Sequence, residues 1–133
     1  SSVVIQYGQG HNVQFTMEGE HNIADIRQFG TSDHTIGFAE DLSSVFQVGN
    51  YNEFYAVQIG KEEGHEITSI GGNDIQLGDG NYIDVWQKGS GHLSKLMQTG
   101  NGNTLHVFQK GDDNLSTISQ IGNGNFADVS QDQ

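Results

Sequence analysis

The sequence predicts an all-β protein, a two-sheet β-solenoid of stacked strand–turn–strand repeats with about 22 residues per coil. Three observations support this prediction. Glutamine recurs every eleven residues from Gln87 to Gln131. A glycine, and then an asparagine or histidine, follow these glutamines at fixed distances. Between the turns, apolar and polar residues alternate, as they do along a half-buried β-strand.

The glutamine positions, which we call anchors, can be followed back through the whole chain. Methionine occupies one anchor position and glutamine occupies the others. The anchors are Gln6, Met17, Gln28, Gln47, Gln58, Gln76, Gln87, Gln98, Gln109, Gln120 and Gln131. We expect the anchor glutamines to point inward and to form the assembly determinants of the molecule.

Turn residues follow the anchors at constant spacing. Two residues after an anchor stands glycine: Gly8, Gly19, Gly30, Gly49, Gly60, Gly78, Gly89, Gly100, Gly111 and Gly122. Five residues after it stands asparagine in most copies: Asn22, Asn52, Asn81, Asn103, Asn114 and Asn125. The other four copies have His11, Asp33, Glu63 and His92 there. Glycine and asparagine adopt positive φ at little cost, so this spacing predicts a tight turn after every strand.

The strand segments have one apolar face and one mixed face, because side chains alternate along a strand. The positions in line with the anchors are uncharged in the regular copies: Val13, Phe15, Ala24, Ile26, Phe54, Ala56, Ile83, Val85, Leu105 and Val107. The opposite positions include charges: Tyr82, Asp84, Trp86, Thr104, His106, Phe108, Phe126, Asp128 and Ser130. We therefore expect the first face to lie inside.

Two strands make one coil, so even and odd strands are expected in two facing sheets. Ser94 and Ser116 alternate with Ile83 and Leu105 at the same position of the repeat, which predicts that small residues pack opposite these large ones. Inward glutamines of successive coils would then lie about 4.8 Å apart and bond to one another.

The period breaks between Gln28 and Gln47 and between Gln58 and Gln76. Each gap has two open interpretations: a degenerate extra strand, over Thr35–Ala39 or Glu66–Ile70, or a bulging loop. We count eleven regular strands, with up to two more irregular ones. Residues 1–133 are expected to form a single domain with irregular repeats around 31–46 and 61–75.

Composition excludes several functions. The chain has no Cys and no Pro, 19 Gly, and a net charge of −12 with only five Lys and Arg, which argues against nucleic acid as a partner. No apolar run reaches the roughly 20 residues of a transmembrane helix. No signal peptide is visible, which is consistent with a mature, trimmed or cytosolic chain. No capping unit is evident at either end of the repeats, so we expect free strand edges.

The spacing Gln-x-Gly-x-x-Asn, with the next Gln eleven residues after the first, resembles the curlin repeat of bacterial curli subunits. Gln98, Gly100, Asn103 and Gln109 match that pattern, and the similarity extends over nearly the whole chain. Met17 and the two irregular gaps depart from it. The resemblance implies a secreted structural subunit that self-assembles head to tail into extracellular amyloid fibres, which serve biofilm matrix, adhesion and surface colonisation.

The resemblance also implies partners: other copies of the chain, a nucleator or major-subunit paralogue, and an outer-membrane export pore. Whether this chain is the major or the nucleating subunit stays open. A Gly- and Asn-rich export segment is not found before the first repeat, so a trimmed chain is expected. The alternative function is a soluble, monomeric β-solenoid that binds through an outward face, as an adhesin or an ice-binding protein does. Ice binding would need outward threonine columns, and Thr104 and Thr117 are isolated.

Other signals are weak. The six histidines do not recur in one column of the pattern, so turn or surface positions are expected for them. A weak divalent-ion site around Glu62–Glu66 remains an alternative. No nucleophile elbow or calcium-binding nonapeptide is present, so we expect neither enzymatic activity nor a cofactor. The outward Trp86, Tyr55, Phe108 and Tyr82 either bind a ligand, such as a dye, carbohydrate or second filament, or stabilise the sheet.

Overall fold

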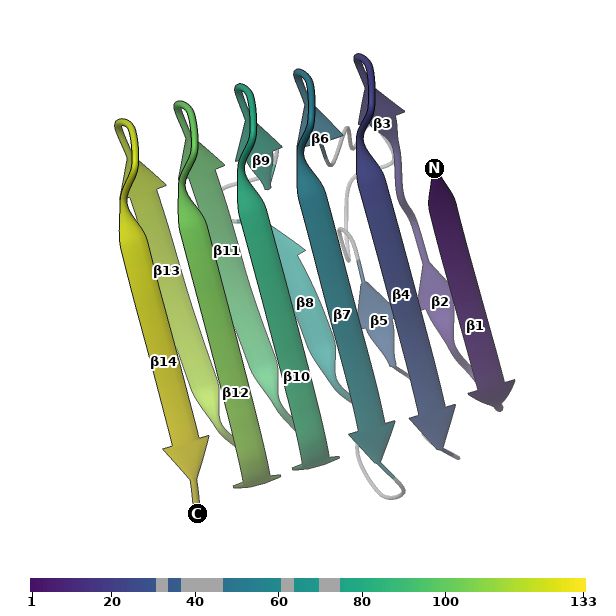
Figure 1. Cartoon of the computed structure of the whole chain (residues 1–133). Coiled ribbons are helices and arrows are strands. Elements are labelled where there is room, and N and C mark those ends of the chain that lie inside the picture. The colour runs from purple at the N-terminus through teal and green to yellow at the C-terminus, as the bar shows by residue number, and fades with distance from the viewer. Residues whose placement is uncertain (31–33, 37–46, 61–63, 70–74) are drawn as a thin grey trace.

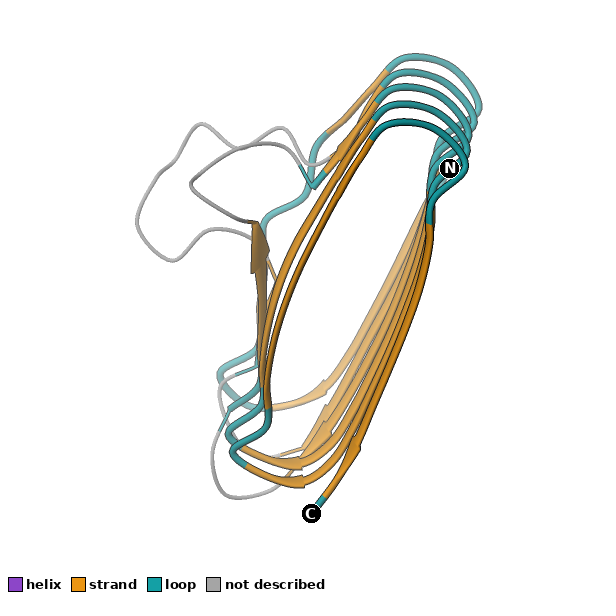
Figure 2. Cartoon of the chain, turned by 90° about the vertical axis from the view of Figure 1, so that its left-hand side faces the viewer, coloured by secondary structure: helices purple, strands orange, loops and turns teal. Residues whose placement is uncertain are grey.

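A computed structural model of the chain describes residues 1–30, 34–36, 47–60, 64–69 and 75–133. These residues form β-strands and turns, with no helix among them. The strands make two sheets, each built of parallel strands, and the two sheets face each other across a narrow interior (Figures 1 and 2). The predicted all-β, two-sheet solenoid is confirmed.

The first sheet, sheet A, contains six long strands that run in the same direction. In spatial order they are β1 (Ser2–Gly8), β4 (Ile23–Gly30), β7 (Glu53–Gly60), β10 (Tyr82–Ser90), β12 (Thr104–Asp112) and β14 (Phe126–Asp132). Their register places each anchor beside the next, so that Gln6 pairs with Gln28 and Gln109 pairs with Gln131. Equivalent residues of the repeat therefore form straight columns across the sheet.

The second sheet, sheet B, contains eight strands. In its first three coils each strand position is occupied by two short strands, and in its last two coils by one long strand. The strands are β2 (Asn12–Val13), β3 (Met17–Glu18), β5 (Thr35–Ile36), β6 (Gln47–Val48), β8 (Glu66–Ser69), β9 (Gln76–Leu77), β11 (Leu93–Thr99) and β13 (Leu115–Ile121). Strand β11 pairs with both β8 and β9 along one edge and with β13 along the other. Strands β8 and β9 are therefore two halves of a single interrupted strand, and the same holds for β5 and β6.

This register shows how the described residues of the irregular gaps fit into sheet B. Thr35 pairs with Asn12, and Gln47 pairs with Met17, so both halves belong to one regular position. Met17 lies four positions after Val13, whereas Gln47 lies eleven positions after Ile36, the partner of Val13. The structure has strands within both segments where a degenerate strand was predicted, β5 (Thr35–Ile36) and β8 (Glu66–Ser69). Because β5 shares one position of sheet B with β6, and β8 shares one with β9, neither adds a further strand position. Residues 37–46 and 70–74 themselves lie outside the described residues.

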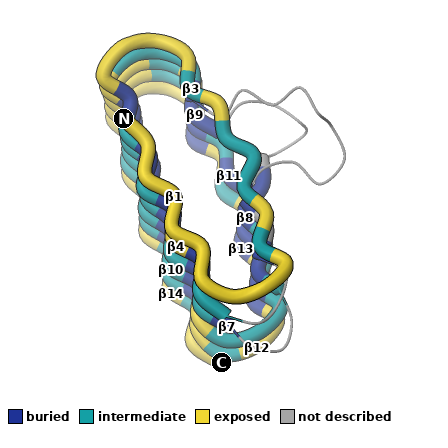
Figure 3. Tube along the Cα trace, turned by 90° about the vertical axis from the view of Figure 1, so that its right-hand side faces the viewer, coloured by how far each residue is buried: buried dark blue, intermediate teal, exposed yellow. Residues whose placement is uncertain are grey.

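The interior follows the predicted inward face. Ile26, Phe54, Ile83 and Leu105 are fully buried on sheet A, and Ile36, Ile67 and Leu96 are fully buried on sheet B. Burial is greatest in the middle of the stack, whereas β1 is exposed along its whole length (Figure 3). Stacking of one coil on the next therefore provides most of the burial, which adds stability roughly in proportion to apolar area.

The expected packing of small against large residues needs a correction. Facing strands run in opposite directions, so the start of one lies across from the end of the other. The Ser94 hydroxyl accepts a hydrogen bond from Gln87 Nε2 (3.2 Å) and donates one to Gln109 Oε1 (3.0 Å). Ser94 thus packs against the anchor glutamines of sheet A, and the prediction that it packs opposite Ile83 and Leu105 is wrong.

Candidate functional site

The anchor glutamines of sheet A form a ladder, by which we mean a column of side-chain amides bonded strand to strand. The Nε2 atom of each glutamine donates to the Oε1 atom of the next: Gln6 to Gln28 (2.8 Å), Gln28 to Gln58 (2.9 Å), Gln58 to Gln87 (3.0 Å), Gln87 to Gln109 (2.8 Å) and Gln109 to Gln131 (2.8 Å). All bonds point the same way, so the ladder has a direction. Such bonds make buried amides tolerable in a narrow core.

The glutamines also connect the two sheets. Gln98 on sheet B donates to the main-chain oxygen of Tyr82 on sheet A (3.1 Å), and Gln120 donates to that of Thr104 (3.0 Å). In the opposite direction, Gln28 on sheet A donates to the main-chain oxygen of His34, the residue before β5 of sheet B (3.0 Å). Each Nε2 has two hydrogens, and here one serves the ladder while the second binds a strand end of the opposite sheet.

Sheet B has the same ladder with one interruption. Gln47 donates to Gln76, Gln76 to Gln98 (3.3 Å) and Gln98 to Gln120 (2.7 Å). The preceding position in the column is Met17, whose thioether cannot donate. Gln47 Oε1 is consequently buried without a hydrogen-bond partner. Such an orphaned acceptor typically costs about 1–3 kcal/mol.

A second ladder closes the turn after each strand of sheet B. Asn22, Asn52, Asn81, Asn103 and Asn125 each occupy the same place in this turn. Asn52 Oδ1 accepts the amide of Asn81 (2.9 Å), and Asn52 Nδ2 donates to the carbonyl of Gly78 (2.7 Å). The other members make equivalent bonds to the next coil. Each asparagine up to Asn103 thus ties two coils together through both of its polar atoms, and Asn125 ends the column.

The turn glycines leave room for this stacking. Gly100 has φ +114°, and a Cβ there would overlap the carbonyl group of Gly122 on the next coil. The backbones of successive turns therefore approach too closely for any side chain. Positive φ alone would admit asparagine, so this close approach gives the physical reason for glycine.

Four histidines form a column at the opposite turn, after the strands of sheet A. His11, His34, His65 and His92 stack with ring centroids 4.8 Å apart at each step and ring planes within 8° of parallel. His34, His65 and His92 are almost completely buried. The prediction that the histidines share no recurring column is therefore wrong.

The misassignment came from the spacing. Counting five residues from each anchor points to Asp33 and Glu63, which lie outside the described residues. The column position is filled instead by His34 and His65, one and two residues further along the chain. His34 stands six residues after its anchor and His65 seven, so a fixed count of five passes over both. A recurring His before an alternating segment was the signal that could have found the column.

A further ladder was not predicted. Asn50, Asp79, Asn101 and Asn123 stand three residues after the sheet B anchors and lie near the surface of the turn. Asn50 N donates to Asp79 Oδ1 (2.7 Å), and Asp79 N donates to Asn101 Oδ1 (2.8 Å). Asn101 N donates in turn to Asn123 (2.8 Å). The column needs only an acceptor atom, which explains why Asp can replace Asn at one place.

The outward aromatic residues contact one another along sheet A. Trp86 and Phe108 stack with ring centroids 4.6 Å apart, and Tyr82 lies 5.6 Å from Tyr55. These are pairs on neighbouring strands, which stabilise parallel sheets as cross-strand contacts. Contacts between these rings can stabilise sheet A, which explains the outward aromatic residues without a ligand.

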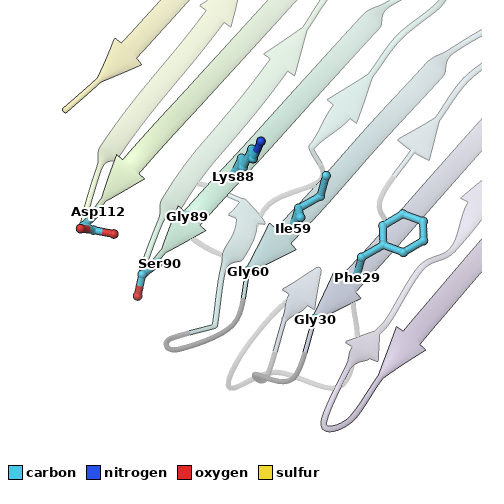
Figure 4. Close-up of a pocket in the computed structure, with 8 residues that line it drawn as sticks. All are labelled: Phe29, Gly30, Ile59, Gly60, Lys88, Gly89, Ser90 and Asp112. Atoms are coloured by element: carbon cyan, nitrogen blue, oxygen red, sulfur yellow. The ribbon is translucent and has the colours of Figure 1, made fainter.

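A surface groove lies at the ends of the sheet A strands. It has a volume of about 610 Å³ and crosses the ends of β4, β7 and β10, between the side chains of Phe29, Ile59 and Lys88 (Figure 4). Its other lining residues are three glycines, Ser90 and Asp112. Among the residues that the structure describes, no three His, Asp or Glu side chains are grouped to hold a metal ion. Of the weak ion site considered around Glu62–Glu66, residues 62 and 63 lie outside those ranges.

No helix in the described part of the chain is long and apolar enough to cross a membrane. Comparison with known proteins adds one finding. The family model described as curlin associated repeat matches residues 100–132. These residues contain β12, β13 and β14, where the ladders are uninterrupted. Searches of curated proteins and of solved structures found no match.

Proposed function

We propose that this chain belongs to the curlin-repeat family, whose model matches residues 100–132, and that it is a structural subunit that assembles head to tail with copies of itself into cross-β fibres. The observation that carries the proposal is the directed glutamine ladder of sheet A. It begins with the acceptor atom of Gln6 and ends with the donor atom of Gln131. A second copy placed against β14 would continue the ladder through a bond from Gln131 Nε2 to its Gln6 Oε1.

The apolar column beside the ladder supports the same junction. Ile26, Ala56, Val85 and Val107 occupy one column and are at most 2 % exposed. Val4 belongs to this column by register but is 48 % exposed, because no strand covers β1. A neighbouring copy would bury Val4 against Val129, the last residue of the column. Free edges of parallel strands pair readily with another chain, and a contact of this head-to-tail type gives a filament.

The biological setting is proposed from the family. The fibres would be extracellular and cell-surface bound, would contribute to biofilm matrix, adhesion and surface colonisation, and would need an export pore and a nucleating or major-subunit paralogue. Residues 1–133 would act as one domain, since both sheets share one core. The role is structural and not enzymatic, and it requires no cofactor or nucleic acid.

Two variants of one strand test the junction. Val3 and Val4 have nearly equal exposure, 49 % and 48 %, but point to opposite sides of β1. Val4→Lys would place a charge in the apolar column of the junction and should stop elongation of wild-type seeds. Val3→Lys would lie outward beside Asp25 and should elongate at close to the wild-type rate. Equal elongation of the two variants would contradict the proposed junction.

The alternative function is a soluble, monomeric binding module with a flat outward face. Thr104 lies in a column between Tyr82 and Phe126, whereas Thr117 pairs with Lys95 on the other sheet. These neighbours form no threonine array of the kind that ice binding requires. An adhesin could use the stacked rings of sheet A, and a monomer that stays soluble without seeding would favour that function.

A further inference from the structure

We propose that His34, His65 and His92 make formation of the stack conditional on the loss of their protons, so that mildly acidic medium opposes folding and neutral medium permits it. The consequence for fibre growth rests on the proposed function, whereas the consequence for folding does not. The proposal stands on how the two nitrogen atoms of each ring are used.

Both ring nitrogens of these residues are committed to the main chain. The Nε2 atoms lie 3.1 Å from the carbonyl oxygens of Phe29, Ile59 and Lys88, which can only accept. Each Nε2 therefore carries the hydrogen. The Nδ1 atoms receive main-chain amides of the next coil: His34 from His65 (3.1 Å), His65 from His92 (3.3 Å) and His92 from Asn114 (3.2 Å). Each Nδ1 must be bare.

A protonated ring would break this arrangement in two ways. Its Nδ1–H would face an amide N–H, so that one coil-to-coil hydrogen bond is lost and two donors are opposed. Its charge would also lie 4.8 Å from the next ring in a water-excluded column. His11, at the end of the column, differs because its Nδ1 has no hydrogen-bond partner.

The pKa of the central member reflects this environment. The pKa of His65 is lowered to about 4, mainly by burial and to a smaller extent by the adjacent His34 and His92, against a raising effect of the hydrogen bond with the Ile59 carbonyl. No charged side chain contributes to this pKa among the described residues. The described charged residues next to the column are Glu66, Lys88, Lys110, Asp112 and Asp113, of which Lys88, Lys110 and the two aspartates are exposed. Asp33, Lys61, Glu62 and Glu63 lie outside the described ranges.

The sign of the pH effect follows from linkage. A histidine with an ordinary pKa of 6.5 when unfolded and about 4 when folded binds more protons in the unfolded state between these values. Stability is therefore complete above pH 6.5 and falls as the pH drops from 6.5 towards 4. At pH 5, His65 alone should make the folding equilibrium about 20-fold less favourable than at neutral pH.

Asparagine is a suitable replacement for these histidines, because the chain already has one at the next position of the column. Asn114 continues the histidine column and donates to the Lys110 carbonyl through Nδ2 (2.9 Å), as the imidazoles donate through Nε2. The Asn ladder at the opposite turn makes the same two bonds to the main chain. Asparagine therefore preserves the hydrogen bonds and does not titrate.

The test compares the triple variant His34→Asn/His65→Asn/His92→Asn with the wild type and with His21→Asn, an exposed turn residue. The denaturant midpoint of β-sheet circular dichroism is measured from pH 7.5 to 5.0, where carboxylates stay mostly ionised. We expect the midpoint to fall with pH for the wild type and His21→Asn and to stay nearly constant for the triple variant. Equal pH dependence of all three proteins would overturn the proposal.

Seeded growth gives a second readout with a distinctive sign. Lower pH reduces the net charge of −12 and should by itself speed association. The histidine column predicts that wild-type growth slows between pH 7 and 5, whereas growth of the triple variant does not. If no fibres form at any pH, the proposed function fails while the circular dichroism comparison still decides the role of the column.

Nitrogen-15 NMR of the histidine-labelled wild type covers the case in which the triple variant does not fold. At pH 5.5 the spectrum should contain the signal of a neutral ring with hydrogen on Nε2 and bare Nδ1, that of His65. Protonation of all six histidines with midpoints near 6.5 in the folded protein would overturn the proposal.

Discussion

Met17 lies beside Gln47 in the anchor column of sheet B and leaves the buried Oε1 atom of Gln47 without a donor. The equivalent pair in sheet A, Gln6 and Gln28, is joined by a 2.8 Å hydrogen bond. The two sheets therefore differ at the first coil. Sheet A begins with a complete ladder, whereas sheet B begins with a break.

Replacing this methionine should repair the break. Met17→Gln provides an Nε2 donor for Gln47 and should raise the free energy of unfolding by about 1 kcal/mol. The denaturant midpoint of β-sheet circular dichroism measures the change. Met97→Gln is the control, because Met97 pairs with Ser119 on the outward side of the sheet. An unchanged or lowered midpoint for Met17→Gln would show that the orphaned acceptor is of no consequence.

The same break bears on fibre growth. A copy added to the stack would place its Gln6 on Gln131 but its Met17 on Gln120, so only the sheet A ladder crosses the junction. Gln131→Ala should therefore slow seeded elongation several-fold and more than Gln120→Ala does. Ser130→Ala, which faces outward, should have little effect. Elongation rates that rank Gln120→Ala as the slower variant would contradict this description of the junction.

Close approach of turns predicts a contrast between two glycines. Gly100→Ala introduces a Cβ that overlaps the Gly122 carbonyl and should destabilise the fold by about 3 kcal/mol or more. Gly102 has φ +65° but open space around it, so Gly102→Ala should cost only about 1 kcal/mol. Thermal or denaturant unfolding measures both. Similar losses would mean that backbone conformation alone, and not the spacing of coils, selects glycine.

The two amide ladders of the sheet B turns should respond differently to charge. Asn81 is fully buried and donates to the Gly100 carbonyl (2.8 Å), so Asn81→Asp would oppose two acceptors and bury a charge. We expect a loss of about 3 kcal/mol or more. Asn123 is exposed and only accepts, from Asn101 (2.8 Å), so Asn123→Asp should change stability by under about 0.5 kcal/mol. An unfolding midpoint for Asn81→Asp close to that of the wild type would contradict the role of the buried ladder.

Much of the fold could be predicted because the repeat is regular. The spacing of anchors fixed the strand positions, and alternation identified the inward face, of which Ile26, Phe54 and Val85 are buried examples. The parallel register also followed, since Gln87 pairs with Gln109 as the period requires. A one-residue slip would turn every inward residue outward, which makes such a register readable from sequence.

The incorrect predictions share one cause: they concern which residues meet in space, and the position of a residue in the repeat does not determine this. The partners of Ser94 could not be inferred, because position in the repeat does not reveal that facing strands run in opposite directions. The histidine column was missed because His34 and His65 stand six and seven residues after their anchors, whereas the count that the regular copies suggest is five. Between Gln28 and Gln47 the spacing left a degenerate strand and a bulging loop both open, because it cannot show that β5 and β6 share one position of sheet B.

The measurement that tests the central claim most directly is seeded assembly of the purified chain. The protein is transferred from denaturant into neutral buffer and followed by thioflavin fluorescence and negative-stain microscopy, with and without sonicated seeds. Unbranched, seedable fibres with a meridional reflection near 4.8 Å are the predicted result. A folded β-sheet monomer that stays soluble for days and does not respond to seeds would contradict it.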